Sequence, residues 1–219
     1  MERKIDIDQN FTRSLKAENI SVSYRKKLVL KDINLSADFS KITCIIGKNG
    51  AGKSTFLKAL MGLIPYRGSF IYNGQALSKN ILQNDFEYVP QVSLLVEDLS
   101  VKDNLLLLTK NGRSFDPASF KNIETLFNKK VRELSLGQKR RVLIESAIAN
   151  KPKFLIMDEP LAGLDFSYKA ELLARLLELK SEMGILMTTH QLEGLKFADK
   201  IYELDEKMLE KNWRTYEYE

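Results

Sequence analysis

The sequence predicts an α/β protein with a mostly parallel sheet, an antiparallel β-region at its start and an inserted helical subdomain. Short apolar runs without alternation, such as "ITCII" and "FLIMD", are typical of parallel strands that are covered on both faces. Stretches between them, such as "YKAELLARLLELKSEM", repeat apolar residues every three or four positions, which is typical of helices. Near the start, apolar and polar residues alternate, which predicts strands with one solvated face.

Length and composition are compatible with one large or two small globular domains. The chain has 219 residues, of which 44% are hydrophobic and 29% charged, and this is enough to bury a sizeable core. The net charge of +5 and the pI near 9.1 are compatible with nucleic acid, an anionic membrane surface or a phosphate-rich ligand as partner. The plainer interpretation is a solvated basic surface, because lysines and arginines are interspersed with acidic residues.

The cysteine count and the apolar pattern of the sequence predict the cellular compartment. Its single cysteine, Cys44, cannot form an internal disulfide and lies in an apolar run, so we expect a buried thiol in a reducing compartment. The first residues, "MERKIDIDQNFTRS", have no apolar core of the kind a secretory signal needs. No stretch approaches the ~18 apolar residues of a membrane-spanning helix. We therefore expect a cytoplasmic protein that acts on a membrane only through a partner.

The elements follow one another in a simple order. The alternating segments "ENISVSY" and "LKDINLSAD" predict two antiparallel strands, and "ITCII", "FEYVP", "FLIMD" and "GILMTT" predict the parallel strands. Helices are expected at "STFLKALMGL", "KRRVLIESAIAN" and "YKAELLARLLELKSEM". We expect a single domain over 1–219. Within it we expect an α/β core over about 17–91 and 151–205, a helical subdomain over about 92–150, and short tails over 1–16 and 206–219.

A phosphate-binding loop is the most specific local signal. The segment "GKNGAGKST" fits G-x-x-x-x-G-K-[ST] between a strand and a helix. Its glycines let backbone N–H groups turn toward a β-phosphate, and the helix N-terminus adds a positive dipole end. Lys53 is expected to contact the β- and γ-phosphates, and the Ser54 hydroxyl to coordinate Mg²⁺. The alternative is a glycine-rich turn without a ligand. The expected nucleotide-binding residues are Gly47, Lys48, Asn49, Gly50, Ala51, Gly52, Lys53, Ser54 and Thr55.

Two carboxylates end the apolar strand in "FLIMDEP". Asp158 is placed to hold the magnesium shell, and the next side chain, Glu159, points elsewhere and is expected to accept a proton from an attacking water. The alternative is an ordinary acidic strand-to-turn junction. The phosphate-binding loop upstream favours the catalytic interpretation.

Together these segments resemble the ATP-binding subunits of ABC (ATP-binding cassette) transporters. Besides the two segments above, "YVPQ" ends in Gln91, "LSLGQ" is similar to the family signature LSGGQ, "LAGLD" follows the acidic pair, and "TTH" ends a late strand. The resemblance runs from about Ala17 to Leu204, nearly the whole chain, and chance assembly of all these motifs in this order is negligible. It implies a RecA-like P-loop NTPase core with ATP and Mg²⁺ as ligands.

The resemblance implies roles for three further residues. Gln91 would contact the metal and the attacking water and also sense a membrane partner docked on the helical region; outside this context it would be an ordinary loop residue. His190, the single histidine, would contact the γ-phosphate and help to orient water, although most lone histidines are structural. Tyr24 stands where the family stacks an aromatic ring on adenine, but a tyrosine in an alternating strand often serves packing.

The resemblance also implies a role for "LSLGQ". This loop would face the γ-phosphate of ATP bound to the other subunit of a head-to-tail dimer, with Ser135 and the Gly137 N–H as donors and with Gln138 retained. Leu136 replaces the family's first glycine, and we expect only a modest effect on loop flexibility and closure. Asp165 in "LAGLD" would lie at the same dimer seam, and it can also be the N-cap of the next helix.

The resulting expectation is an ATP-hydrolysing subunit, peripheral on the cytoplasmic face of the cell membrane. It would dimerise with an identical or a different ATPase chain and drive a separate membrane subunit. Two alternatives stay open: a soluble ATPase of this fold in an assembly process such as iron–sulfur cluster loading, and a nucleotide-dependent binding module without turnover. Nucleic acid is not expected as a partner, because the short helical segment excludes the long insertions of DNA-repair relatives. Substrate and direction of transport stay open.

Overall fold

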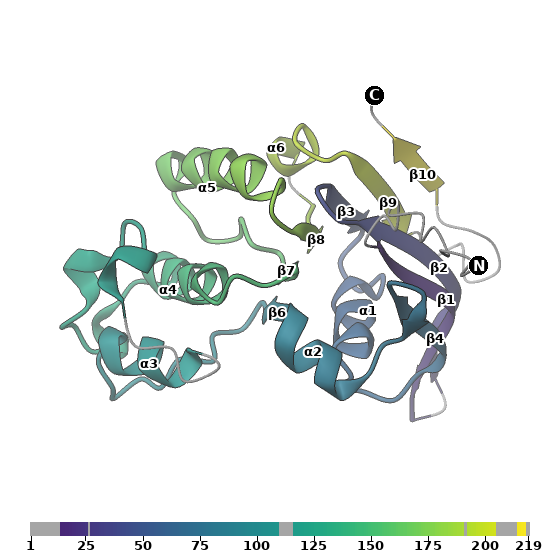
Figure 1. Cartoon of the computed structure of the whole chain (residues 1–219), viewed down its shortest axis with the longest axis horizontal. Helices are drawn as coiled ribbons and strands as arrows, with labels where there is room; N and C mark the ends of the chain where they lie inside the picture. Colours follow the sequence, from purple (N-terminus) through teal and green to yellow (C-terminus); the bar gives the residue numbers. More distant parts are fainter. Residues whose placement is uncertain (1–13, 26, 110–115, 191, 205–213, 218–219) are drawn as a thin grey trace, which may run out of the picture.

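A central sheet runs through the middle of the molecule (Figure 1). The computed structural model describes residues 14–25, 27–109, 116–190, 192–204 and 214–217, and within these the sheet has the strand order β10-β9-β3-β8-β7-β6. Neighbouring strands are parallel, except that β10 pairs antiparallel with β9. The apolar runs predicted as parallel strands are therefore confirmed. The strands are β3 (Ile42–Gly47), β6 (Phe86–Val89), β7 (Phe154–Asp158), β8 (Gly184–Thr188), β9 (Lys200–Leu204) and β10 (Arg214–Glu217).

A smaller antiparallel sheet lies beside the central one, at the right of Figure 1. Its strand order is β2-β1-β4-β5. The alternating apolar residues Ile20, Val22, Ile33 and Leu35 are buried, so the predicted antiparallel β-region is confirmed. The strands are β1 (Ser14–Tyr24), β2 (Lys27–Asp38), β4 (Arg67–Tyr72) and β5 (Gln75–Ala76).

The helices cover both faces of the central sheet. In the described part of 92–150 the chain forms α3, short 3₁₀ turns and α4, as expected for a helical segment, and Figure 1 shows α3 and α4 at the left, away from the antiparallel sheet. Among the described residues, no helix combines the length and the apolar character needed to cross a membrane. The helices are α1 (Lys53–Leu60), α2 (Lys79–Asp85), α3 (Val101–Leu108), α4 (Leu136–Ala149), α5 (Phe166–Leu179) and α6 (Leu192–Leu195).

The central strands bury different side chains on their two faces, because successive residues of a strand point in opposite directions. Met157 and Ile185 pack in the core that includes residues of α3, α4 and α5, whereas Ile156 and Leu186 pack in the core shared with α1 and the antiparallel sheet. Cys44 is buried in the first core as a free thiol, and burial raises its pKa to about 12. The thiol is thus a packing group, as expected.

Two strands extend into the segments expected to be tails. β1 begins at Ser14, within 1–16, and Leu15 is buried in the core of the antiparallel sheet. β10 lies within 206–219 and adds an antiparallel edge to the central sheet. β1 pairs with β2 and β4, and β10 pairs with β9; the polar composition of these segments does not indicate this pairing.

Candidate functional site

The phosphate-binding pattern lies in the turn from β3 to α1. Gly52 is the N-cap of α1 with φ 103, and a Cβ atom there would lie 2.6 Å from the Leu30 side chain. Only glycine fits such a conformation at such a short distance. The turn leaves the first backbone N–H groups of α1 without helical partners, which makes this end of the helix suitable for an anion.

Lys53, the first residue of α1, lies folded across this turn. The residue is only 6% exposed. Its Nζ atom donates hydrogen bonds to the carbonyl oxygens of Gly47, at 2.7 Å, and Lys48, at 3.2 Å, and lies 3.7 Å from Oε1 of Glu159. The ammonium group is therefore positioned inside the loop, beside the buried carboxylate of Glu159.

Asp158 and Glu159 are held by a single hydroxyl group. Thr188 Oγ1, at the end of β8, donates to Asp158 Oδ1 at 2.7 Å and accepts a hydrogen bond from the Glu159 backbone N–H at 2.9 Å. Glu159 has φ 50, a left-handed conformation that is uncommon for a residue other than glycine. This conformation directs the two successive carboxylates to different places, as the sequence predicts.

The Glu159 carboxylate lies between two nitrogen groups. Its Oε2 atom is 2.9 Å from Nδ1 of His190, and its Oε1 atom faces Nζ of Lys53. The side chain of Glu159 is 7% exposed, whereas that of His190 is 54% exposed. A carboxylate in this position can accept a proton from a water at the loop while the imidazole is still able to contact solvent or ligand.

A cavity of about 300 Å³ unites the loop with the predicted catalytic residues. Gln91, which follows β6, and Glu159, which follows β7, both line it, although they are distant in the sequence. The strand order explains this, because β6 and β7 are parallel neighbours whose carboxyl ends meet at one edge. The other lining residues are Asn49, Gly50, Gly52, Lys53, Ser54 and Thr55.

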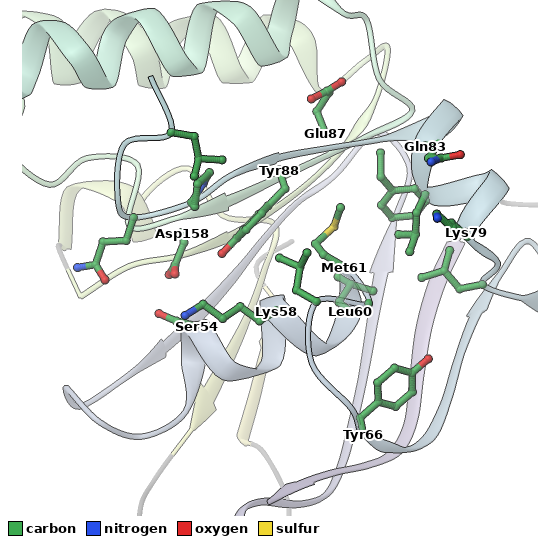
Figure 2. A pocket seen from close by; sticks show the side chains of 18 of the residues that line it. Ser54, Lys58, Leu60, Met61, Tyr66, Lys79, Gln83, Glu87, Tyr88 and Asp158 are labelled. Atoms are coloured by element: carbon green, nitrogen blue, oxygen red, sulfur yellow. The ribbon is translucent and has the colours of Figure 1, made fainter. Parts of the chain in front are cut away.

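A larger groove of about 1040 Å³ adjoins this site (Figure 2). Ser54 and Asp158 lie near each other at one end of it, and Figure 2 shows the Tyr88 hydroxyl directed toward them. That hydroxyl is buried without a hydrogen-bond partner among the described residues, and burial raises its pKa. Exposed apolar side chains also line the groove, namely Leu63, Val92 and Leu94.

The signature segment forms the start of α4. Ser135 is its N-cap, with Oγ accepting from the Gln138 N–H at 3.2 Å, and the Gln138 side chain accepts from the Ser135 N–H at 3.0 Å. The helix thus begins three residues before the predicted "KRRVLIESAIAN". Neither cavity is lined by the expected nucleotide-binding residues Ser135, Gly137 and Gln138. Within a single chain these residues therefore do not lie at the phosphate loop.

The two central positions of "LSLGQ" differ in the space around them. A Cβ atom on Gly137 would lie 2.9 Å from the carbonyl oxygen of Gly163, so a side chain there would collide with backbone. Leu136 is 81% exposed and has room for its side chain. The packing of α4 against the "LAGLD" loop therefore requires glycine at position 137. It tolerates leucine at position 136, where the family signature has its first glycine.

Asp165 and Tyr24 lie outside both cavities. Asp165 is the N-cap of α5, as the sequence predicts, and it pairs with Arg141 of α4. The hydrogen bond from the Tyr168 backbone N–H, together with Arg141, lowers its pKa. Tyr24 is 44% exposed at the end of β1. The role predicted for Asp165 depends on a second chain, and the role predicted for Tyr24 depends on a bound adenine ring.

Two residues with direct links to the site were not predicted individually. Thr188 belongs to the quoted "TTH", but only the pairing of β7 with β8 brings its hydroxyl to Asp158. Arg140 lies in the predicted helix, and its burial against the ends of β6 and β7 has no local signal beyond a charge within an amphipathic stretch.

Comparison with known proteins gives consistent matches. A family profile described as ABC transporter matches residues 30–162. The chain is 36% identical to the zinc import ATP-binding protein ZnuC of Haemophilus influenzae, covering 84% of this chain and 69% of the relative. It is 29% identical to the lipopolysaccharide export system ATP-binding protein LptB of the same species, covering 86% and 85%. A solved ATP-binding subunit of an ABC transporter is similar with a TM-score of 0.78 and 31% identity, covering 87% and 85%.

Proposed function

The chain belongs to the ABC transporter family as an ATP-binding subunit, and from this premise we propose that it hydrolyses ATP and thereby powers transport through a separate membrane subunit. The observation that carries the hydrolytic part is the position of Glu159. Its buried carboxylate lies at the phosphate loop, 3.7 Å from Lys53 and 2.9 Å from His190. A binding module without turnover has no need of a base at this place.

The residues of the site fit an ATP–Mg²⁺ complex. Ser54 and Asp158 lie near each other (Figure 2), and Gln91 lines both cavities. The site therefore offers a hydroxyl, a carboxylate and an amide to a metal ion. No group of three or more His, Cys, Asp or Glu side chains suitable for a metal occurs in the described part of the chain. Mg²⁺ bound with nucleotides characteristically uses few carboxylates together with phosphate oxygens and waters. When bound, the ion would neutralise charge that develops on the β- and γ-phosphates.

Each side chain of the site then has a separate role in hydrolysis. Lys53 exchanges its contacts with the Gly47 and Lys48 carbonyls for phosphate oxygens, and Glu159 is released from Lys53. Glu159 accepts the proton of the attacking water, while His190 and Gln91 orient that water and the γ-phosphate. Thr188 holds the Asp158 carboxylate and the Glu159 backbone N–H in place during these steps.

A second ATPase chain completes each site. Ser135 and the N-terminus of α4 offer donors for an anion, yet they line neither cavity of their own chain. A head-to-tail dimer would place them on the γ-phosphate held by the partner, and a second copy of this chain suffices because each copy has both surfaces. Loss of the bridging phosphate after hydrolysis would then open the dimer.

The signature loop gives a prediction that separates binding from turnover. We expect Ser135→Arg to lower kcat by about 100-fold or more while the Kd for ATP of the single chain stays unchanged, because the bulky cation would occupy the surface that faces the partner's phosphate. Phosphate release and calorimetry measure the two quantities. Ser100→Arg is the matched control: Ser100 is the N-cap of α3, so it loses an equivalent cap without facing the site. Unchanged turnover of Ser135→Arg would contradict the role across an interface.

The groove in Figure 2 is the surface we assign to the membrane subunit. The exposed side chains of Leu63, Val92 and Leu94 offer an apolar contact area at the groove. Gln91 and Asp158 also line this groove, so a docked segment would touch the loop that also lines the phosphate cavity. This arrangement would place the chain on the cytoplasmic face of the membrane and let ATP binding move its partner.

A further inference from the structure

Arg140 connects three elements that carry site residues. It lies five positions after Ser135 in α4 and is only 6% exposed. Its Nη1 atom donates a hydrogen bond to the Pro90 carbonyl, after β6, and its Nη2 atom donates to the Asp158 carbonyl, at the end of β7. One guanidinium group therefore joins the helix of the signature segment to the two segments that precede Gln91 and Glu159.

The two acceptors identify which parts of the backbone are held. The carbonyl oxygen of Pro90 belongs to the peptide group that leads into Gln91, and that of Asp158 belongs to the peptide group that leads into Glu159. The second of these peptide groups is held on its other side by Thr188, which accepts from the Glu159 N–H at 2.9 Å. Arg140 thus fixes the backbone from which the Gln91 and Glu159 side chains extend, and it does so from outside the cavity.

Packing alone is a poor explanation for this arginine. A buried guanidinium is costly unless its donors are paired, and here the Nε atom has no hydrogen-bond partner among the described residues. Burial lowers the pKa of Arg140, while the nearby Asp158 carboxylate favours its charged form. Buried neighbours on α4, such as Val142 and Ile144, contact the same core with apolar side chains. An apolar residue would fill the space without this cost.

We propose that Arg140 is a positioning residue for hydrolysis, which transmits the position of the signature helix to Gln91 and Glu159. When the N-terminus of α4 moves onto a partner's phosphate, the guanidinium moves the two peptide groups with it. Contact of the signature segment with the partner's phosphate is thereby linked to the placement of Glu159 and the attacking water in the chain's own site. This inference rests on the proposed function, because it needs turnover and a second chain.

The test is the ATPase kinetics of Arg140→Met, which keeps the length of the side chain and removes every donor. We expect kcat per folded protein to fall by about 10- to 100-fold, because displacement of a base by about an ångström has effects of this size. We expect the KM for ATP to change little, because Lys53 and the loop do not contact Arg140. In a Gln91→Ala background, Arg140→Met should reduce kcat by a smaller factor than it does in the wild type.

A matched control separates positioning from folding. Arg175 of α5 pairs with the buried Glu145 of α4, away from the cavities, so Arg175→Met removes another guanidinium contact of the same helix. We expect it to lower Tm with an unchanged kcat below the transition. If Arg140→Met does not fold, Arg140→Lys replaces it in the test. Lysine can bond only one of the two carbonyl groups at a time, so we again expect a lower kcat with little change in the KM for ATP.

The outcomes distinguish this inference from the function it rests on. A wild-type kcat in Arg140→Met, while Glu159→Gln is inactive, would overturn the positioning role and leave the ATPase intact. A fall in kcat that is fully additive with Gln91→Ala would also contradict it. Absence of phosphate release from the wild-type chain itself would refute the proposed function, and the inference with it.

Discussion

Glu159→Gln is expected to lower kcat for ATP hydrolysis by about 100- to 10,000-fold, the contribution of a well-placed general base. The amide keeps the size of the side chain but accepts no proton from water. Affinity for a non-hydrolysable ATP analogue should be retained or increase, because the carboxylate that lies 3.7 Å from Lys53 no longer competes with phosphate for that cation. Phosphate release and calorimetry on the same preparation measure both effects.

Glu178→Gln is the control for this prediction, since Glu178 is an exposed residue of α5 outside both cavities. It should hydrolyse ATP at the wild-type rate. If Glu159→Gln kept more than about a tenth of the wild-type kcat, the loss would fall below the range for a general base, and another group would have to activate the water.

Lys53→Ala is expected to weaken binding of Mg-ATP by about 2–5 kcal/mol, roughly 30-fold to several thousand-fold. Lys53 supplies the buried cation of the loop, and its removal also leaves Glu159 beside the triphosphate without a compensating charge. Both effects disfavour the bound anion. Calorimetry with the full chain measures the change in Kd.

Lys58→Ala serves as the comparison, because Lys58 lies in the same helix but is exposed and outside the phosphate cavity. Its Kd for Mg-ATP should equal that of the wild type. Wild-type affinity in Lys53→Ala would mean that the loop binds its ligand by other groups, and the assignment of the phosphate site would fail.

The sequence predicts those parts of the fold that have a local cause. The run "ITCII" and the pattern around Lys53 indicate a strand, a turn and a helix because apolar residues and glycines act over a few positions. The capping pair of Ser135 and Gln138 also follows a local rule, S-x-x-Q, which predicts a helix start at "LSLGQ". The resemblance implies a nucleotide contact for Gln138, and in the single chain its side-chain oxygen accepts the Ser135 N–H at the start of the helix.

Other features depend on contacts between distant segments. Thr188 reaches Asp158 because β7 and β8 are neighbours in the sheet, and Arg140 reaches Pro90 because α4 packs against the ends of β6 and β7. The edge strand β10 forms by pairing with β9 across an intervening segment. Residue type alone does not determine such pairings, so these features emerge only from the folded chain.

ATP-driven closure of two chains is the central claim, and the solution mass of Glu159→Gln tests it most directly. Light scattering on a sizing column, with and without Mg-ATP, reports whether the non-hydrolysing chain is trapped in the closed state. We predict an increase from 25.1 kDa to about twice that mass when Mg-ATP is added. A mass that stays at one chain, while calorimetry shows ATP bound, would contradict closure between two copies through the signature loop.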